Sequence, residues 1–404
     1  MLIAYPLAPR LRTADRELKL SYTAAMSETM DARPVKIERV EVLALQIPLE
    51  KSFSGSSYRI EKKMAIVTRV HCSDGIVGEA VNGEGELALQ PAIVGIIQGE
   101  LAQRLTGRDP TAIEARWAEM WQSTWLGGRD RRASVRAVAC LDCALWDAQG
   151  KRLGVPLRKL WGGHRDEVQV IAMGGYYVEG WTPADYGREM EEFRALGLAG
   201  CKFKVGGRTP AEDAERFAAA RAAGGDDFIL VPDANRGWSV REAVEFARRA
   251  EKSGIRWFEE PCHWNNDRRD MRRVREAVGL PLGAGQSEMS LEGCRDLIAD
   301  GAIDVCNLDA SWGGGASVWL RLAGVTRAYG CEMAHHGEPI LGGQLIASVA
   351  HGTYMETHHP LRDPLFHRLV VNRNPFKAGS YRVPDQPGWG VTLDAELVSR
   401  YRVN

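Results

Sequence analysis

The sequence has no excess of acidic or of basic residues, and this balance limits the kinds of macromolecule that it is expected to bind. Among 404 residues, 53 are acidic and 52 are basic, so the formal net charge is −1. Domains that bind nucleic acid through its phosphates usually carry a large basic excess. The sequence also lacks a run of about 18 apolar residues, the length that crosses a bilayer. We therefore expect neither a nucleic-acid partner nor a membrane-spanning segment.

The eight cysteines, spread from Cys72 to Cys331, show no disulfide framework. Only Cys140 and Cys143 have metal-ligand spacing, and no second such pair accompanies them. Their surroundings repeat apolar residues at helical spacing, which favours two small side chains packed on a helix. Without a disulfide framework or a signal-peptide pattern, we predict a reducing, cytoplasmic location.

The first part of the chain is predicted to form an α+β module. Residues 1–34 show no sustained period, and we interpret them as an extension. From residue 35 onward, two segments rich in β-branched residues flank the turn Ser73–Gly75, which is typical of a hairpin. Helical patterns follow over residues 90–105, 110–121 and 131–153. Residues 35–160 are thus predicted to be one domain, an antiparallel sheet followed by helices.

The second part, residues 161–372, alternates short apolar strands with helical stretches. Eight strands begin near residues 168, 200, 228, 255, 280, 303, 331 and 353, and seven helical stretches lie between them. This pattern predicts a (β/α)7β barrel. An open doubly wound sheet is the alternative, but no glycine-rich dinucleotide motif follows the first strand. The turn-rich residues 373–404 are expected to return to the first domain.

Polar residues end seven consecutive predicted strands, where barrels carry their active sites. Charges at such a place must be paired or bound to metal, because isolated burial is costly. We therefore predict one active site from these residues: Lys202 and Lys204; Asp233 and Asn235; Glu259, followed by Glu260; Gln286, with Glu288 two residues on; Asp309; His335 and His336; Glu356.

The residue types indicate a chemistry. Asp233 and Glu259 are hard oxygen donors on adjacent strands, which suits Mg²⁺. His336 needs a partner that orients its ring, and Asp309 on the neighbouring strand can supply it. A lysine in a cationic, desolvated site is expected to have a lowered pKa and to act as a base. A cation facing two bases suits removal of a proton α to a carboxylate.

The sequence resembles the enolase superfamily, specifically its mandelate racemase-like subgroup, from about residue 35 onward. The resemblance is carried jointly by "KFKVGG", "PDANRGW", "WFEEP" and "LDASWGGGAS", and by "ALWDAQGKRLGVPLRKLWGG" at the domain junction. It implies a modified barrel with a capping domain built from the N-terminal part and the C-terminal tail. It also implies one Mg²⁺ per subunit, a small carboxylate substrate and a homo-oligomer, as a dimer, tetramer or octamer.

The resemblance assigns roles to the strand-end residues. Lys204 is similar to the family's base, and Lys202 beside it contacts the substrate carboxylate or tunes its neighbour. Asp233 and Glu259 match the first two metal ligands, with Asn235 placed to assist. Asp309 and His336 match the Asp–His dyad, which leaves His335 a packing role. Glu356 matches the acid that hydrogen-bonds the substrate carboxylate.

Gln286 departs from the family pattern, which usually has glutamate as the third metal ligand. An amide carbonyl can coordinate Mg²⁺ but adds no charge, so affinity should fall. Glu288 could replace it if the strand continues, since it would lie on the same face. Loss of the metal site is the third alternative.

Two reactions remain open on this basis. A sugar acid with a 3-hydroxyl would lose water through an enediolate to give a 2-keto-3-deoxy acid, whereas a substrate without a leaving group would be racemised or epimerised. Dehydration is favoured by the resemblance. Outside enzymes, a non-catalytic small-acid binding homologue and an assembly role are the alternatives. Substrate choice is expected to depend on residues 51–63 and 83–90.

Overall fold

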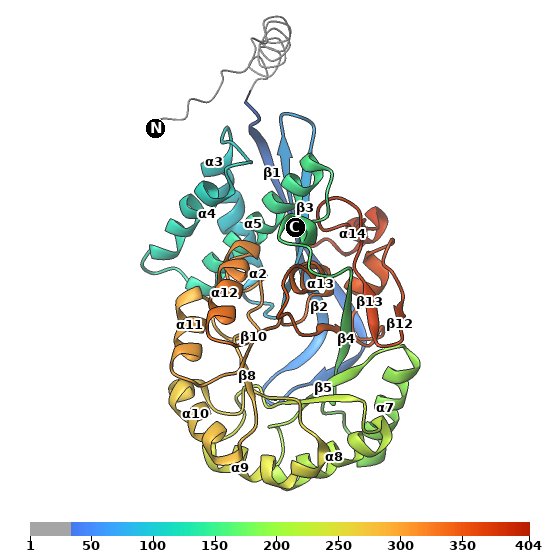
Figure 1. The fold of residues 1–404 in the computed structure, drawn as a ribbon. Coiled ribbons are helices and arrows are strands. Elements are labelled where there is room, and N and C mark those ends of the chain that lie inside the picture. The colour runs from blue at the N-terminus through green and yellow to red at the C-terminus, as the bar shows by residue number, and fades with distance from the viewer. Residues whose placement is uncertain (1–33) are drawn as a thin grey trace, which may run out of the picture.

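The computed structural model describes residues 34–404, so the predicted extension 1–34 lies outside it except for its last residue. Figure 1 shows two parts: a capping part around strands β1, β2 and β3 at the top, and a ring of strands and helices below it. The fold matches the predicted architecture, a (β/α)7β barrel beneath an α+β capping domain.

The capping part is a three-stranded antiparallel sheet in the order β1–β2–β3, packed against helices. Its hairpin at Ser73–Gly75 forms as predicted, with Gly75 at φ 81°. The longest helix ends at Gly154, whose φ of 69° suits glycine. The elements are β1 (Ile37–Ser54), β2 (Arg59–Cys72), β3 (Val77–Glu84), α2 (Gln90–Ile96), α3 (Ala102–Leu105), α4 (Ile113–Trp121), α5 (Arg131–Leu153) and α6 (Leu157–Leu160). A π-helical turn, Ile97–Leu101, joins α2 to α3.

Eight parallel strands form the barrel, in the ring order β4 to β11. β11 pairs with β4, and a parallel bridge between Met333 and Gly352 connects the β10 and β11 sides. The strands are β4 (Glu167–Gly174), β5 (Gly200–Lys204), β6 (Ile229–Asp233), β7 (Phe258–Glu259), β8 (Leu282–Ala284), β9 (Val305–Cys306), β10 (Glu332–Met333) and β11 (Met355–His358).

The seven predicted helices follow the first seven of these strands. Three of them begin at capping boxes, Thr182 with Asp185, Thr209 with Glu212 and Ser239 with Glu242, where side chain and backbone satisfy each other's hydrogen bonds. The helices are α7 (Pro183–Ala195), α8 (Pro210–Gly224), α9 (Val240–Arg249), α10 (Asp267–Val278), α11 (Leu291–Ala299), α12 (Ala316–Ala328) and α13 (Pro339–Ser348).

The inside of the barrel has an apolar layer that supports the polar strand ends. One buried cluster joins Ile171, Val231, Trp257, Val305 and Ala334 from different strands. Further along the same strands lie the buried charged residues. The alternation of side chains along each strand places these charges inside the barrel mouth.

The C-terminal segment contacts both parts. It contains β12 (Phe376–Lys377), β13 (Ser380–Arg382) and α14 (Ala395–Tyr401), and β13 pairs antiparallel with β4. The Nε1 atom of Trp389 donates to the Cys143 carbonyl of α5 (3.0 Å), and the Val403 amide donates to Ala44 of β1 (2.9 Å). The tail thus ties the capping part to the barrel.

The hairpin between β1 and β2 extends over the barrel mouth. Ser54 forms a bridge with Tyr177, which lies beyond β4, and Tyr58 Oη donates to Asn235 Oδ1 (3.3 Å). Residues 51–63, expected to influence substrate choice, therefore contact the strand ends directly.

Asp142 of α5 gives a stability prediction. Its carboxyl is buried and accepts hydrogen bonds from the amide (2.9 Å) and hydroxyl (2.6 Å) of Ser317 in α12. Burial raises the pKa of Asp142 to about 7, despite those bonds. A carboxyl with a raised pKa in the folded state stabilises the fold at low pH, and this contribution is lost as the pH rises from about 4 to about 7.

Replacing Asp142 by asparagine removes the ionisation and keeps the shape. Thermal scans at pH 5.5 and pH 8 should therefore show that the wild type loses more Tm than Asp142→Asn over this range, by a few degrees. Ser317→Ala is the control, because it weakens the same contact but leaves the carboxyl able to ionise. An equal Tm difference at both pH values would contradict the prediction.

Candidate active site

A pocket of about 540 Å³ opens between the capping part and the C-terminal ends of the barrel strands. Its lining includes the predicted residues Lys204, Asn235, Gln286, Asp309 and His336. Residues of the two capping segments, 57–63 and 83–87, complete its walls. Part of the predicted set is therefore brought around one space, whereas Lys202, Asp233, Glu259, Glu288, His335 and Glu356 do not belong to its lining.

Two buried lysines neutralise buried carboxylates at the ends of the barrel strands. Lys202 Nζ lies 2.8 Å from Glu259 Oε1 and 2.8 Å from Glu356 Oε1, and Lys204 Nζ lies 2.5 Å from Asp233 Oδ2. The Gly337 amide also donates to Glu356 Oε2 (2.8 Å), which fixes that carboxylate. These contacts satisfy the charges that burial would otherwise make costly.

The expected lowering of the lysine pKa is wrong for this arrangement. Burial lowers the pKa of Lys204, but the attraction of Asp233 outweighs it, and the pKa lies well above its usual range. Lys202 is shifted in the same direction, because Glu259 and Glu356 outweigh its burial. The sequence showed two neighbouring cations, whereas the fold brings a carboxylate into direct contact with each.

The Asp–His dyad forms as predicted. His336 Nδ1 lies 2.9 Å from Asp309 Oδ2, and the Ser311 amide donates to Asp309 Oδ1 (2.7 Å). Burial lowers the pKa of His336 well below its usual value, so the ring is neutral. With the Nδ1 proton directed at Asp309, Nε2 keeps its lone pair and can accept a proton.

His335 has the packing role expected of it. It is fully buried, and its Nε2 accepts a hydrogen bond from the Ala310 amide (3.1 Å). Successive residues of a strand face opposite sides, so only one of the two histidines reaches the pocket.

Trp312 connects the dyad to the capping part. Its ring centroid lies 4.9 Å from that of His336, and its Nε1 donates to the Gly83 carbonyl (3.0 Å). The guanidinium carbon of Arg136, from α5, lies 4.9 Å from the Trp312 ring centroid. The orientation of the His336 ring is thus supported by contacts that begin in the other domain.

Gln286 lies at the strand end where a third metal ligand was expected. Its Nε2 donates to Glu260 Oε2 (2.9 Å), while its Oε1 is buried without a hydrogen-bond partner. A carboxylate only accepts, so Glu260 determines which way the amide points. Glu260 was noted in the sequence but given no role. It reaches the pocket because its φ of 40° departs from the strand conformation.

The structure does not bring Glu288 to the pocket. The strand ends at Ala284, and Gln286 and Ser287 turn the chain, so the predicted alternation does not continue. The Glu288 carboxylate is packed against α11, so closely that a Cβ atom added at Gly293 would clash with Glu288 Oε2. Of the two predicted alternatives, only Gln286 lines the pocket.

The oxygen donors fit a hard divalent cation. Asp233 and Glu259 are paired in register on neighbouring strands, and the unpartnered Gln286 Oε1 is an orphaned acceptor at the next strand end. Buried acceptors of this kind are rare unless they bind something. Across residues 34–404, no group of three His, Cys, Asp and Glu side chains is placed to hold a metal ion. A site built here would therefore depend on the amide oxygen of Gln286.

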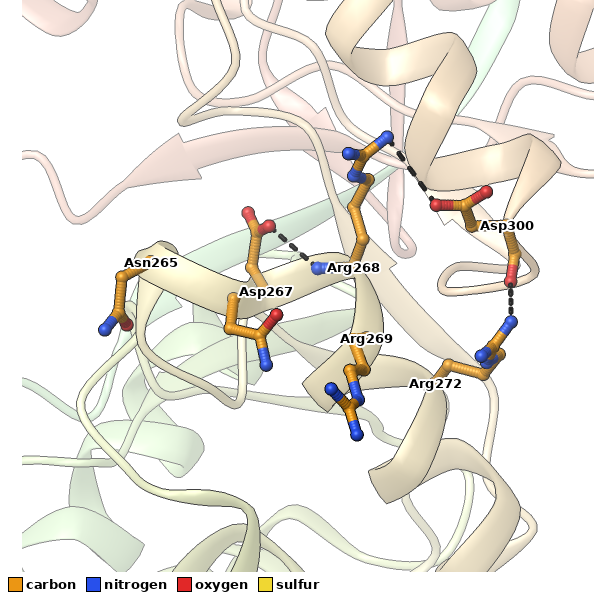
Figure 2. Close-up of a pocket in the computed structure, with 7 residues that line it drawn as sticks. Asn265, Asp267, Arg268, Arg269, Arg272 and Asp300 are labelled. Atoms are coloured by element: carbon orange, nitrogen blue, oxygen red, sulfur yellow. Dashed lines mark hydrogen bonds and ion pairs between the residues drawn. The ribbon is translucent and has the colours of Figure 1, made fainter.

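A second hollow, of about 340 Å³, lies at the start of α10 (Figure 2). Two of the three arginines that line it are held by neighbouring groups: Arg268 pairs with Asp300 (3.6 Å), and Arg272 donates to the Asp300 carbonyl (3.5 Å). None of the strand-end residues lines this hollow. No cysteine lines the main pocket, and all eight are buried and free. No helix among the described residues is long and apolar enough to cross a membrane.

Two family models match the chain. Residues 185–397 match the model described as enolase C-terminal domain-like, and residues 36–162 match that of the mandelate racemase / muconate lactonizing enzyme N-terminal domain. The chain belongs to the enolase superfamily. Within it, the N-terminal match indicates the mandelate racemase/muconate lactonizing enzyme family.

This enolase superfamily member is similar to named enzymes and to solved structures. It is 30% identical to arabinonate dehydratase of Saccharolobus solfataricus, over 85% of this chain and 92% of that protein. It is 32% identical to 3,6-anhydro-alpha-L-galactonate cycloisomerase of Streptomyces coelicolor, over 91% and 99%. The structure of a mandelate racemase/muconate lactonizing enzyme from a marine actinobacterium in complex with magnesium superposes with a TM-score of 0.86 at 45% identity, covering 92% of this chain and 100% of that one.

Several pocket residues of this superfamily member were not predicted. Two follow predicted site residues at a spacing of two, a signal that could have found them: Glu338 after His336, and His358 after Glu356 on the same strand. Arg136, Tyr176 and Trp312 come from the capping part or from loops and were given no role. Tyr58 and Lys63 fall within segment 51–63, which was expected to influence substrate choice, but neither was singled out.

Proposed function

We propose that the protein is a Mg²⁺-dependent enzyme that removes the proton α to a carboxylate, and that it dehydrates a sugar acid to a 2-keto-3-deoxy acid. The observation that carries this proposal is the placement of two proton-transfer groups around one pocket. Lys204 is on β5, and the Asp309–His336 dyad follows β9 and β10, on the other side of the ring of eight strands. The names of the relatives, a dehydratase and a cycloisomerase of sugar acids, support the same chemistry.

Asp233, Glu259 and Gln286 would hold the Mg²⁺, with Glu260 orienting the Gln286 amide. When bound, Mg²⁺ supplies positive charge that stabilises the negative charge developing on the substrate carboxylate. Because Lys204 pairs with Asp233, a cation held by Asp233 would compete with that ion pair and would free the lysine to face the substrate. The magnesium-bound structural neighbour supports this choice of metal.

The remaining residues divide the proton transfers. A cation at Asp233 would remove the ion pair that holds the pKa of Lys204 high, so that the ammonium can give its proton to solvent. The neutral Lys204 amine then takes the α-proton, and the electrons of that C–H bond move into the carboxylate to form an enediolate. His336, neutral in the free site, first takes a proton from solvent on Nε2 and then delivers it to the 3-hydroxyl; the C–O bond breaks, water leaves, and the resulting enol becomes the 2-keto acid. Glu356 and Lys202 form a buried ion pair beside Gly337, which lines the pocket, and we assign them to the substrate carboxylate. Asn235, fixed by Tyr58, is placed to contact the substrate from the capping side.

A screen of sugar acids with Mg²⁺ tests the proposal, with 2-keto product detected by semicarbazone absorbance. At least one acid is expected to give product. The second candidate, racemisation or epimerisation, is favoured by the presence of bases on both sides of the pocket. Exchange of the α-proton with deuterium in the absence of 2-keto product would indicate racemisation or epimerisation. Absence of both would overturn the proposed function.

Gln286→Glu is expected to tighten Mg²⁺ binding by about tenfold, because it adds a third negative charge to the oxygen donors. Without Mg²⁺ the new carboxylate faces Glu260, so the Tm should fall, and added Mg²⁺ should restore it. Titration calorimetry and thermal scans with and without MgCl₂ measure both effects.

Glu288→Gln is the matched control for this variant. Its carboxylate lies against Gly293, so its loss should leave Mg²⁺ affinity within about twofold of the wild type. If Glu288→Gln abolished binding while Gln286→Glu left it unchanged, Glu288 and not Gln286 would be the third ligand.

A further inference from the structure

The loop that follows the Lys204 strand is held by a cluster of residues that the proposed reaction does not use. The loop is residues 205–208, and the cluster consists of Tyr177 beyond β4 and of Asp213 and Arg216 on α8. Asp213 and Arg216 are fully buried, and none of the three is among the described residues that line the pocket. Because a buried ion pair adds little net stability by itself, the contacts that this pair makes indicate its role. We call the three residues the supporting cluster.

Arg216 fixes the backbone of Lys204. Its Nη1 donates to the Lys204 carbonyl (3.3 Å) and also pairs with Asp213 Oδ1, while its Nη2 donates to the carbonyl of Gly175. A guanidinium group is planar and has its donors in fixed directions, so its position determines where these carbonyls lie. The end of β5 is thus tied to a charged side chain on the helix that follows it.

Asp213 and Tyr177 hold the two glycines of the loop. Asp213 Oδ2 accepts hydrogen bonds from the Gly206 amide (2.8 Å) and from Tyr177 Oη (2.8 Å), and the Gly207 amide donates to Tyr177 Oη (2.7 Å). Burial and the Asp213 carboxylate raise the pKa of Tyr177 above its usual range, so the hydroxyl keeps its proton and donates it. The ring packs so closely on Gly207 that a Cβ atom added there would lie 2.6 Å from it. One hydroxyl therefore joins the loop to the buried ion pair.

The backbone of Tyr177 is bonded to the capping hairpin. Its amide donates to the Ser54 carbonyl (2.8 Å), at the bridge that joins β1 to the segment beyond β4. The same hairpin carries Tyr58, which donates to Asn235 beside the β5 strand end. Tyr177 therefore holds the hairpin with its backbone and the loop after β5 with its hydroxyl.

We propose that Tyr177 is a positioning residue for Lys204: its hydroxyl, together with the Asp213–Arg216 pair, holds the end of β5 so that the lysine side chain reaches the α-carbon of the substrate. This role rests on the proposed function, because it takes Lys204 as the group that removes the α-proton. Misplacement of a reacting group by about 1 Å can lower the rate by about 10²-fold, so a residue outside the pocket can affect turnover. Substrate binding should depend on Tyr177 much less, since this residue does not line the pocket.

Tyr177→Phe removes only the hydroxyl that holds the loop, and Tyr186→Phe is its matched control. Both tyrosine rings have their centroids 4.2 Å from the guanidinium carbon of Arg216, and Tyr186 lies on the neighbouring helix α7 (Figure 1). The Tyr186 hydroxyl, in contrast, is buried without a hydrogen-bond partner within residues 34–404. Rates are measured on the full chain with Mg²⁺ and an acid that the wild type turns over. We expect Tyr177→Phe to lower kcat for α-proton exchange by about tenfold or more and to change KM by less than about threefold. Tyr186→Phe should keep both constants within about twofold of the wild type.

Hydrogen–deuterium exchange of the backbone amides, followed by mass spectrometry without substrate, reports on the loop itself. Tyr177→Phe should raise the exchange rate of residues 205–208 by about tenfold or more, because the Gly207 amide loses its acceptor and Asp213 loses a donor. Residues 131–153 of α5 should exchange as in the wild type, and Tyr186→Phe should leave residues 205–208 unchanged. A general loss of folding would instead speed exchange in both segments.

An equal loss of kcat in the two variants would overturn the positioning role, as would an unchanged kcat in Tyr177→Phe. A higher KM without a lower kcat would also overturn it, because Tyr177 would then act in substrate binding. A lower kcat without faster amide exchange in residues 205–208 would contradict the route through the loop and overturn it too. Absence of exchange and product from the wild type with every acid would reject the proposed function and the positioning role together, whereas each of the other outcomes leaves the proposed function intact.

Discussion

Lys204→Ala is expected to lower the rate of α-proton exchange and of product formation by about 10⁴-fold, the upper end of what one acid–base group contributes. The lysine is the one cationic base that lines the pocket from β5, and it lies 2.5 Å from Asp233. Because the same substitution removes the partner of a buried carboxylate, the folded fraction must be measured by circular dichroism before rates are compared.

Lys151→Ala is the matched control for this variant. It also breaks a lysine–aspartate pair, in which Lys151 Nζ lies 2.6 Å from Asp147 Oδ2, but that pair lies on α5 and does not line the pocket. Its kcat should equal that of the wild type even if its Tm falls. A Lys204→Ala variant that kept more than a tenth of the wild-type exchange rate on the true substrate would remove Lys204 from the mechanism.

His336→Asn is expected to lower dehydration by about 10³-fold or more while sparing proton exchange on the Lys204 side. The imidazole is the group that delivers a proton to the leaving hydroxyl, whereas the α-proton is taken from the opposite side. Asparagine can still donate to Asp309, so the local structure is retained. Nuclear magnetic resonance in D₂O separates the two events, since exchange and product give different signals.

His335→Asn provides the comparison for that histidine. His335 accepts a backbone hydrogen bond and is fully buried, so its replacement should lower the Tm and leave the rate of the folded fraction near the wild-type value. If His336→Asn lost exchange and dehydration equally, the two proton transfers would not be divided between the two residues as proposed.

The sequence predicts the barrel and the strand-end residues well, because both depend on local alternation and on strand order. Asp309 and His336 are an example: each ends a predicted strand, and parallel neighbours bring their ends together. Pairings that depend on longer-range packing were not predictable in this way. The lysine pKa prediction failed because the spacing of Lys202 and Lys204 does not show which carboxylates each will touch.

Backbone conformation explains the other differences. Glu260 itself has a left-handed backbone conformation, which turns its side chain into the pocket. Glu288 follows the turn after Ala284, which directs it away from the pocket. Strand alternation therefore predicts the wrong side for both residues. Lys63 and Tyr58 lie on a capping hairpin whose position over the barrel is set by contacts between distant segments. No short sequence motif specifies such contacts.

The hydrogen bond from Trp312 to the Gly83 carbonyl limits how this scaffold can be re-engineered. One way to change the substrate specificity of a fold with separate capping and barrel parts is to exchange the whole capping part between relatives. Here a graft that shifted Gly83 would also displace the indole ring that lies beside His336, so a change meant for substrate choice would reach the proton donor. Chimeras of this protein should therefore keep residues 82–86 from the same parent as Trp312. Sequence changes in residues 82–86 and around Trp312 are expected to be correlated among relatives.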